Sequence, residues 1–218
     1  MAFHKIDWEN WERAEYYRYY REIIRTRFNL TLRLDITPLL PALKERGLKF
    51  YPAFVWAVMK AVNSHKEFRM ALDKEGNLGW YDECHPGYTV FHKDNGTFSD
   101  LWSEYSPSFR TFYAGMTGDM ERYGDVHKVK GKPGGPPNFC SLSCAPWLDF
   151  TGYACDTYTG SDMFFPVITF GKYRQEGEKT TIPFNIWVHH AVADGWHVHC
   201  LTQTLQELLA RPESWLDS

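Results

Sequence analysis

Apolar residues occupy every second position from Ile182 to Val188, with Asn185 among the residues between them. This period of two predicts a β-strand with two distinct faces. Leucines at helical spacing follow between Leu201 and Leu209, so a helix is expected next. Residues 189–197, with the sequence HHAVADGWH, therefore lie at a predicted strand-to-helix junction, where a short polar connection can face a cleft.

The rest of the chain shows further strand-like and helix-like segments. Alternating patterns predict strands over 28–34, 139–147 and 164–173, and several strands with tight turns over 68–101. Helices are expected after Asp7 as a possible cap, from Thr37 to about 46, over the strongly apolar stretch 53–62, and from Ser106 to about 123. Residues 124–138, rich in Gly, Pro and Lys, form the main predicted loop.

Length and charge narrow the class of protein. A chain of 218 residues with 44% hydrophobic and 17% aromatic residues predicts one domain, 1–218, with a sizeable core. The net charge of −3 gives no electrostatic footprint for nucleic acid. No apolar run approaches the roughly 20 residues that span a bilayer, and the N-terminus does not resemble a signal peptide. The expected location is therefore the cytoplasm.

Five cysteines without paired spacing indicate reduced, mostly buried thiols.

The adjacent histidines of the junction are the first candidates for chemistry. Side chains alternate along a strand, so His189 and His190 should point in opposite directions, with His190 continuing the aliphatic row. An imidazole among apolar neighbours stays neutral and can accept a proton, as a general base must. A core histidine satisfied by backbone groups is the structural alternative. A metal site that includes His197 and His199 is a third, but no spacing here matches a zinc signature, so no metal is expected.

The motif His-x-x-x-Asp-Gly, here formed by His190, Asp194 and Gly195, resembles that of the CoA-dependent acyltransferases. The longer form HHAVADGWH is similar to the chloramphenicol acetyltransferase family, which usually has Cys at the position of Ala193. Segments of 68–105, 139–147 and 164–173 extend the similarity along nearly the whole chain. The resemblance implies an α/β fold, a mixed β-sheet with helices packed on one side. It also implies acetyl transfer from acetyl-CoA, as co-substrate, to a hydroxyl of chloramphenicol in a ternary complex. The family forms homotrimers with active sites between subunits.

The same resemblance assigns roles to particular residues. In the catalytic group, His190 is the general base, Ser143 holds the oxyanion, Thr169 holds a water, and Asp194 pairs with Arg13 to brace the histidine turn. The expected cofactor-binding residues are Tyr173, Tyr51 and Trp147, and the expected substrate-binding residues are Tyr20, Phe28, Phe98 and Ser141. Taken alone, Ser143 would be a strand serine bonded to backbone, Arg13 a solvated helix residue, and the tyrosines ordinary packing.

The chain departs from the family pattern around the expected acceptor pocket. The aromatic residue that the family brings from the 124–138 loop is not found, and Lys130, Gly131 and Lys132 occupy that neighbourhood. Ser141 replaces an Asn, and Cys155 replaces a larger apolar residue. An O-acetyltransferase for a different small hydroxylated acceptor is therefore an alternative. A non-catalytic trimeric scaffold is a more distant one, and a 2-oxoacid dehydrogenase acyltransferase is disfavoured because the chain has no room for a lipoyl domain.

Overall fold

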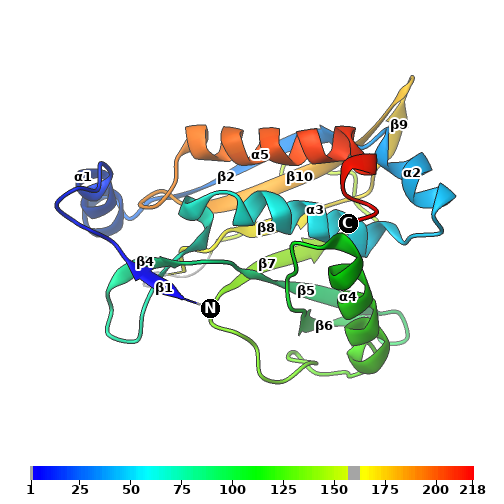
Figure 1. Ribbon diagram of the computed structural model, residues 1–218, viewed down its shortest axis with the longest axis horizontal. Helices are drawn as coiled ribbons and strands as arrows, with labels where there is room; N and C mark the ends of the chain where they lie inside the picture. The colour runs from blue at the N-terminus through cyan, green and yellow to red at the C-terminus, as the bar shows by residue number, and fades with distance from the viewer. Residues whose placement is uncertain (1, 157–162) are drawn as a thin grey trace.

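A mixed β-sheet covered by helices forms the body of the molecule in the computed structural model, which describes residues 2–156 and 163–218 (Figure 1). The strands are β1 (Phe3–Lys5), β2 (Arg27–Asp35), β3 (Met70–Leu72), β4 (Leu78–Tyr81), β5 (His85–His92), β6 (Thr97–Trp102), β7 (Phe139–Cys144), β8 (Val167–Phe170), β9 (Arg174–Glu176) and β10 (Lys179–His189). The α-helices are α1 (Ala14–Arg18), α2 (Leu39–Glu45), α3 (Phe50–Asn63), α4 (Phe109–Tyr123) and α5 (Gly195–Ala210). Shorter helices are the π-helix η1 (Tyr19–Ile23) and the 3₁₀ turns η2 (Lys66–Arg69) and η3 (Pro212–Ser214).

Seven strands form the main sheet, in the order β2-β10-β8-β7-β5-β6, with β9 paired to the start of β10. β7 runs parallel to both β5 and β8, and the other pairs are antiparallel. β10 is buried along most of its length, which explains its nearly unbroken apolar sequence. A separate small sheet, β1-β4-β3, joins the N-terminal strand to residues 70–81.

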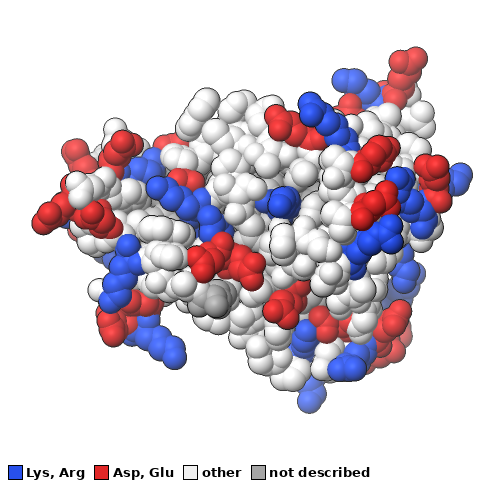
Figure 2. Space-filling view, in the orientation of Figure 1, with Lys and Arg blue, Asp and Glu red and all other residues white. Residues whose placement is uncertain are grey.

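Helices α3, α4 and α5 pack together on one face of the main sheet (Figure 1). α3 is the central one, and ten of its fourteen residues are buried, from Pro52 to Val62. The predicted fold class, a mixed sheet with helices packed on one side, is therefore confirmed. Figure 2 shows basic and acidic side chains interspersed around the rim of this face, while its centre carries few charges.

The N-terminal segment differs from the sequence prediction. Asp7 does not cap a long helix: its carboxylate accepts hydrogen bonds from the backbone N–H of Glu9 and the side-chain amide of Asn10, closing a turn. The first helix begins only at Ala14 and passes into η1 within five residues. The aromatic residues that suggested one helix are instead divided between this turn and two short helices.

A row of polar side chains crosses the sheet face that points away from α3 and α5. Residues paired directly across neighbouring strands place their side chains on the same face, and the pairing aligns one polar residue from each of six strands. Between β5 and β7, the pair Tyr88↔Leu142 places the next residues, Thr89 and Ser143, beside each other. From β6 to β2 the row consists of Asp100, Thr89, Ser143, Thr169, Asn185 and Thr31. Their neighbours along each strand, such as Leu142 and Ile168, point into the helix-covered core.

The outer edge of β6 is covered by the 124–138 loop. The backbone N–H of Asp100 donates to Val129 O at 2.8 Å, and that of Gly131 donates to Asp100 O at 3.0 Å. These bonds make a short parallel bridge between Asp100 and Lys130. A Cβ at position 131 would approach Leu101 Cδ2 to 2.8 Å, so glycine is needed for this close contact.

Candidate active site

His190 directly follows the last residue of β10, and its ring lies between two aromatic side chains. It stacks on Tyr20 with ring centroids 3.8 Å apart and an interplanar angle of 6°, and it meets the edge of Phe28 at 5.1 Å. Its Nδ1 is buried and has no hydrogen-bond partner among the residues that the structure describes. Nε2 is therefore the ring nitrogen that can reach another molecule. The neighbours of the ring are aromatic and not aliphatic, because the strand ends before His190 and the turn redirects its side chain.

Asp194 joins three parts of the chain at this turn. Its Oδ2 accepts a hydrogen bond from Arg13 Nη1 at 2.7 Å, the pairing predicted from the sequence. Its Oδ1 lies 2.8 Å from His197 Nδ1 and accepts from the backbone N–H of Trp196, which caps α5. Arg13 also donates to His190 O at 3.3 Å. Burial alone would raise the pKa of Asp194, but the hydrogen bonds from Arg13 and His197 lower it to about 2.

His189 points to other neighbours than His190, as strand alternation predicts. Its side chain is buried, its ring meets Phe164 edge-on at 4.9 Å, and its Nδ1 accepts a hydrogen bond from the backbone N–H of Ala191 at 3.2 Å. These contacts are those of a packing residue that helps to hold the turn.

Ser143 lies near the centre of the polar row. Its Oγ is 3.5 Å from Thr89 Oγ1. Thr169, directly opposite on β8, is buried, as is Asn185 beyond it. Hydroxyl groups gathered on a shielded face can stabilise a developing negative charge on a ligand oxygen.

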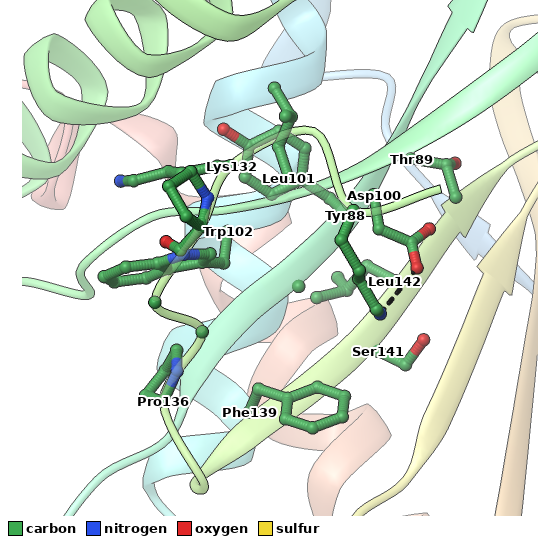
Figure 3. A pocket seen from close by; sticks show the side chains of 15 residues that line it. Tyr88, Thr89, Asp100, Leu101, Trp102, Lys132, Pro136, Phe139, Ser141 and Leu142 are labelled. Atoms are coloured by element: carbon green, nitrogen blue, oxygen red, sulfur yellow. Dashed lines mark hydrogen bonds and ion pairs between the residues drawn. The ribbon is translucent and has the colours of Figure 1, made fainter. Parts of the chain in front are cut away.

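A cavity of about 390 Å³ opens beside this row. Ser141, two residues before Ser143 on the same strand, lines it together with Thr89 and Asp100 (Figure 3). Phe139 supplies aromatic surface next to Ser141, and Trp102 supplies it on the side of the cavity opposite Asp100 and Thr89.

Other predicted ligand-binding residues surround this region. Phe98 is 57% exposed and pairs across the hairpin with Phe91, whose ring meets Trp147 edge-on at 4.8 Å. Tyr173 is exposed and packs on Phe50.

Tyr51 lies deeper than the other predicted cofactor-binding residues. Its hydroxyl donates to Thr89 O at 3.2 Å, and burial raises its pKa well above the ordinary value. The hydroxyl of Tyr51 therefore has a partner within the chain.

The predicted residues fall into two groups that one chain does not bring together. Asn185 pairs with Thr169, which pairs with Ser143, whereas His190 lies five residues further along β10. At about 3.3 Å per residue and 4.8 Å per strand, the Cα atoms of His190 and Ser143 are about 19 Å apart. Within a single copy, His190 and Ser143 are therefore too far apart to contact one reacting centre. Tyr20 and Phe28, expected in the acceptor pocket, lie with His190 and not with Ser141 and Phe98.

Sequence reasoning missed Thr89 and Asp100, which extend the row of Ser143 to the cavity. Both stand in strands with ordinary alternation, and the sequence carries no signal for strand register between β5, β6 and β7. Only the paired structure shows that they share a face and a level with Ser143.

The chain is similar to known proteins along nearly its whole length. The sequence profile for the family "Chloramphenicol acetyltransferase" matches residues 1–206. A chloramphenicol acetyltransferase of Clostridium perfringens is 41% identical over 216 residues, covering 99% of each chain. One from Clostridium butyricum is 38% identical over 218 residues, covering both chains fully. Among solved structures, a chloramphenicol acetyltransferase superposes with a TM-score of 0.83 at 24% identity, over 95% of this chain and 100% of the other. A dihydrolipoamide acetyltransferase of Azotobacter vinelandii gives 0.66 at 16% identity, over 87% of this chain and 84% of the other.

Proposed function

Because the chain belongs to the chloramphenicol acetyltransferase family, we propose that it transfers an acetyl group from acetyl-CoA to a hydroxyl of chloramphenicol, inactivating the antibiotic. The single observation that carries the proposal is the ring of His190, held by Tyr20 with one nitrogen shielded and the other open to a second molecule. Membership of this family makes the chain an acetyltransferase. The roles proposed below for its site residues are supported by the contacts that these residues make.

The proposed reaction needs a base and an oxyanion site. Nε2 of His190 takes the proton of the acceptor hydroxyl as its oxygen attacks the thioester carbonyl carbon. The carbonyl electrons move to the oxygen, which Ser143 Oγ stabilises, with Thr169 holding a water nearby. When the carbonyl re-forms, the C–S bond breaks and the imidazolium returns the proton to the coenzyme thiolate. A ternary complex gains from positioning both substrates and needs no acyl-enzyme.

The oxyanion contribution has a definite size. Removing one well-placed donor from such a site typically costs about a hundredfold in rate, or roughly 3 kcal/mol. Asp194 and Arg13 act as supports of the histidine turn, because their contacts are to each other, to His197 and to the backbone of His190.

The separation of His190 from Ser143 supports a shared active site. We infer that a second copy of the chain brings its His190 to the Ser143 row of the first, in the homotrimer expected for the family. Repeating one heterologous contact around a three-fold axis closes the ring and completes three sites. Each subunit then contributes one half to each of two sites.

Acetyl-CoA would enter from the side of Tyr173 and Trp147, whose exposed rings suit a nucleotide or a pantetheine arm, with Tyr51 packed beneath. The proposed chemistry requires no metal. None of the described helices is both long and apolar enough to cross a membrane. We further propose that the enzyme works in the cytoplasm and consists of one catalytic domain, 1–218.

The test is release of free thiol from acetyl-CoA, with and without chloramphenicol. The wild type should release thiol only with the acceptor, and His190→Ala should reduce the rate about a hundredfold or more. The matched control is His199→Ala, which removes an exposed imidazole of α5 near the same turn. Near wild-type turnover in His190→Ala would remove this residue as the base.

A different hydroxylated acceptor is the second candidate function. The charged residues Asp100 and Lys130 at the cavity favour it, because an aromatic residue is expected from this loop in the family. Thiol release with a panel of hydroxylated compounds separates the two, since a better acceptor than chloramphenicol would show a higher kcat/KM.

A further inference from the structure

Asp100 stands at the same level of the sheet as Ser143, two strands away. Asp100 pairs with Thr89 on β5. The neighbouring pair Tyr88↔Leu142 places Thr89 beside Ser143 on β7, with their hydroxyl oxygens 3.5 Å apart. All three side chains are on the face away from the helices. At about 4.8 Å per strand, Asp100 lies about 10 Å from Ser143, the length of a small acceptor molecule.

The carboxylate of Asp100 has capacity for a ligand. Its Oδ2 accepts a hydrogen bond from Lys130 Nζ at 2.8 Å, and within the described part of the chain its Oδ1 has no partner. Both residues line the cavity, and Figure 3 shows the Asp100 carboxylate above Ser141 with Thr89 alongside. The side chain of Asp100 is 33% exposed and that of Lys130 is 74% exposed, so the pair is reachable from the cavity.

The charges of this pair restrict what can occupy the space beside it. The pair is neutral overall and offers one carboxylate oxygen as acceptor and ammonium hydrogens as donors. A charged ligand group would be attracted by one member of the pair and repelled by the other, and an apolar group would remove water from the ions without replacing its hydrogen bonds. A neutral polar group avoids both costs.

The second lysine of the loop does not change this balance. Lys132 Nζ bonds to Asp119 Oδ2 at 2.8 Å and lies over the ring of Trp102 at 4.0 Å. Its charge is therefore compensated within the wall of the cavity, and the Asp100–Lys130 pair is the ionic group that faces the ligand.

We propose that the Asp100–Lys130 pair binds the end of the acceptor remote from the acetylated hydroxyl and selects acceptors with a neutral polar group at that end. This inference rests on the proposed acetyl transfer and names a specificity determinant for it. Chloramphenicol meets the requirement through the lysine: its nitro group lies at the opposite end of the molecule from its terminal hydroxyl, and the nitro oxygens can accept a hydrogen bond from the ammonium of Lys130, which Asp100 holds in place.

The experiment compares kcat/KM for chloramphenicol and for its analogue with hydrogen in place of the nitro group. The wild type should prefer the nitro compound about tenfold. The double variant Asp100→Ser, Lys130→Leu should reduce this preference to about twofold or less while KM for acetyl-CoA stays unchanged. The milder variant Asp100→Asn, which keeps the shape of the side chain, should at least halve the preference.

Asp217→Asn is the matched control, because it weakens the ion pairs of Asp217 with Arg46 and Arg110, none of which lines the cavity, and it should keep the tenfold preference. An unchanged preference in both cavity variants, or its absence in the wild type, would overturn the inference while acetylation itself persists. Failure of the wild type to acetylate either compound would instead contradict the proposed function.

Discussion

The ring of His190 is positioned by packing and not by a hydrogen bond to its buried nitrogen. Tyr20 lies parallel to it at 3.8 Å, and Phe28 closes a second side. An aromatic pair of this kind contributes about 1 kcal/mol beyond its buried area. Tyr20, which was expected to contact substrate, therefore stacks on the ring of the proposed base, His190, within one chain.

Replacing Tyr20 separates these two roles. Tyr20→Phe keeps the stacked face and should leave kcat within about twofold of the wild type, whereas Tyr20→Leu should lower kcat about fivefold through a less well oriented imidazole. Steady-state kinetics with varied acceptor measures both effects. A rise of acceptor KM in Tyr20→Phe, with kcat unchanged, would show instead that the hydroxyl binds substrate.

Asp194 makes the stability of the folded chain depend on pH, and the contacts of its carboxylate determine the direction of this dependence. Its folded pKa of about 2 is below the ordinary value of about 3.9. The group thus contributes stability above the unfolded pKa and loses it as pH falls from about 4 towards 2. Because a third of the side chain is exposed, solvent screening limits this contribution to about 1 kcal/mol.

Asp194→Asn should therefore unfold more easily than the wild type at pH 7, and the difference should narrow as pH falls below 4. Urea denaturation at several pH values measures it. An Asn variant with wild-type stability at pH 7 would contradict a bracing role for the Arg13 pair.

Among the elements, periodic sequence patterns predicted β10 and α5 and the buried character of α3. The asparagine and threonines of the polar row gave no such signal, because a strand pattern reveals two faces but not the register with its partners. The pairing of β1 with β4 was also missed, since β1 has only three residues, too few to show a period. The late start of α1 reflects a side chain, Asp7, that closes a local turn in place of a helix cap.

The 124–138 loop is an element whose attachment can be tested. The ammonium of Lys132 has 14% side-chain exposure and bonds to Asp119, which also accepts from Ser103. Lys132→Met should leave that carboxylate poorly compensated and lower the free energy of unfolding by about 2 kcal/mol. The control is Lys93→Met, which removes an exposed lysine of a neighbouring turn and should change stability by less than about 0.5 kcal/mol. Equal effects of the two variants in thermal or urea unfolding would contradict the role of the Lys132–Asp119 pair in attaching the loop.

At the scale of the whole molecule, the proposed active site requires a second copy of the chain, because its two halves lie far apart within one copy. His190 with its aromatic platform forms one half, and Ser143 with Thr169 and the cavity forms the other. Rigid strands separate them, so no small movement within one chain would join them.

Complementation between inactive variants tests this arrangement. His190→Ala and Ser143→Ala should each be strongly impaired, by about a hundredfold. Unfolding and refolding them together in equal amounts should restore activity to about one quarter of the wild type, because a quarter of randomly formed interfaces combine two intact halves. Each variant refolded alone is the control. Activity that stays at the sum of the separate variants would mean that both halves act within one subunit.

The bridge between Asp100 and Lys130 has a consequence for solubility as well as for ligand choice. An uncovered outer strand offers unpaired amides and carbonyls to any passing chain, and stacking of that kind leads to fibrous aggregates. The loop that shapes the cavity also blocks this route along β6. Mutations that change acceptor preference by shortening or rerouting residues 129–131 would therefore expose the edge of β6 and promote aggregation. Evolution of substrate preference at this position is thus constrained by the need to avoid aggregation.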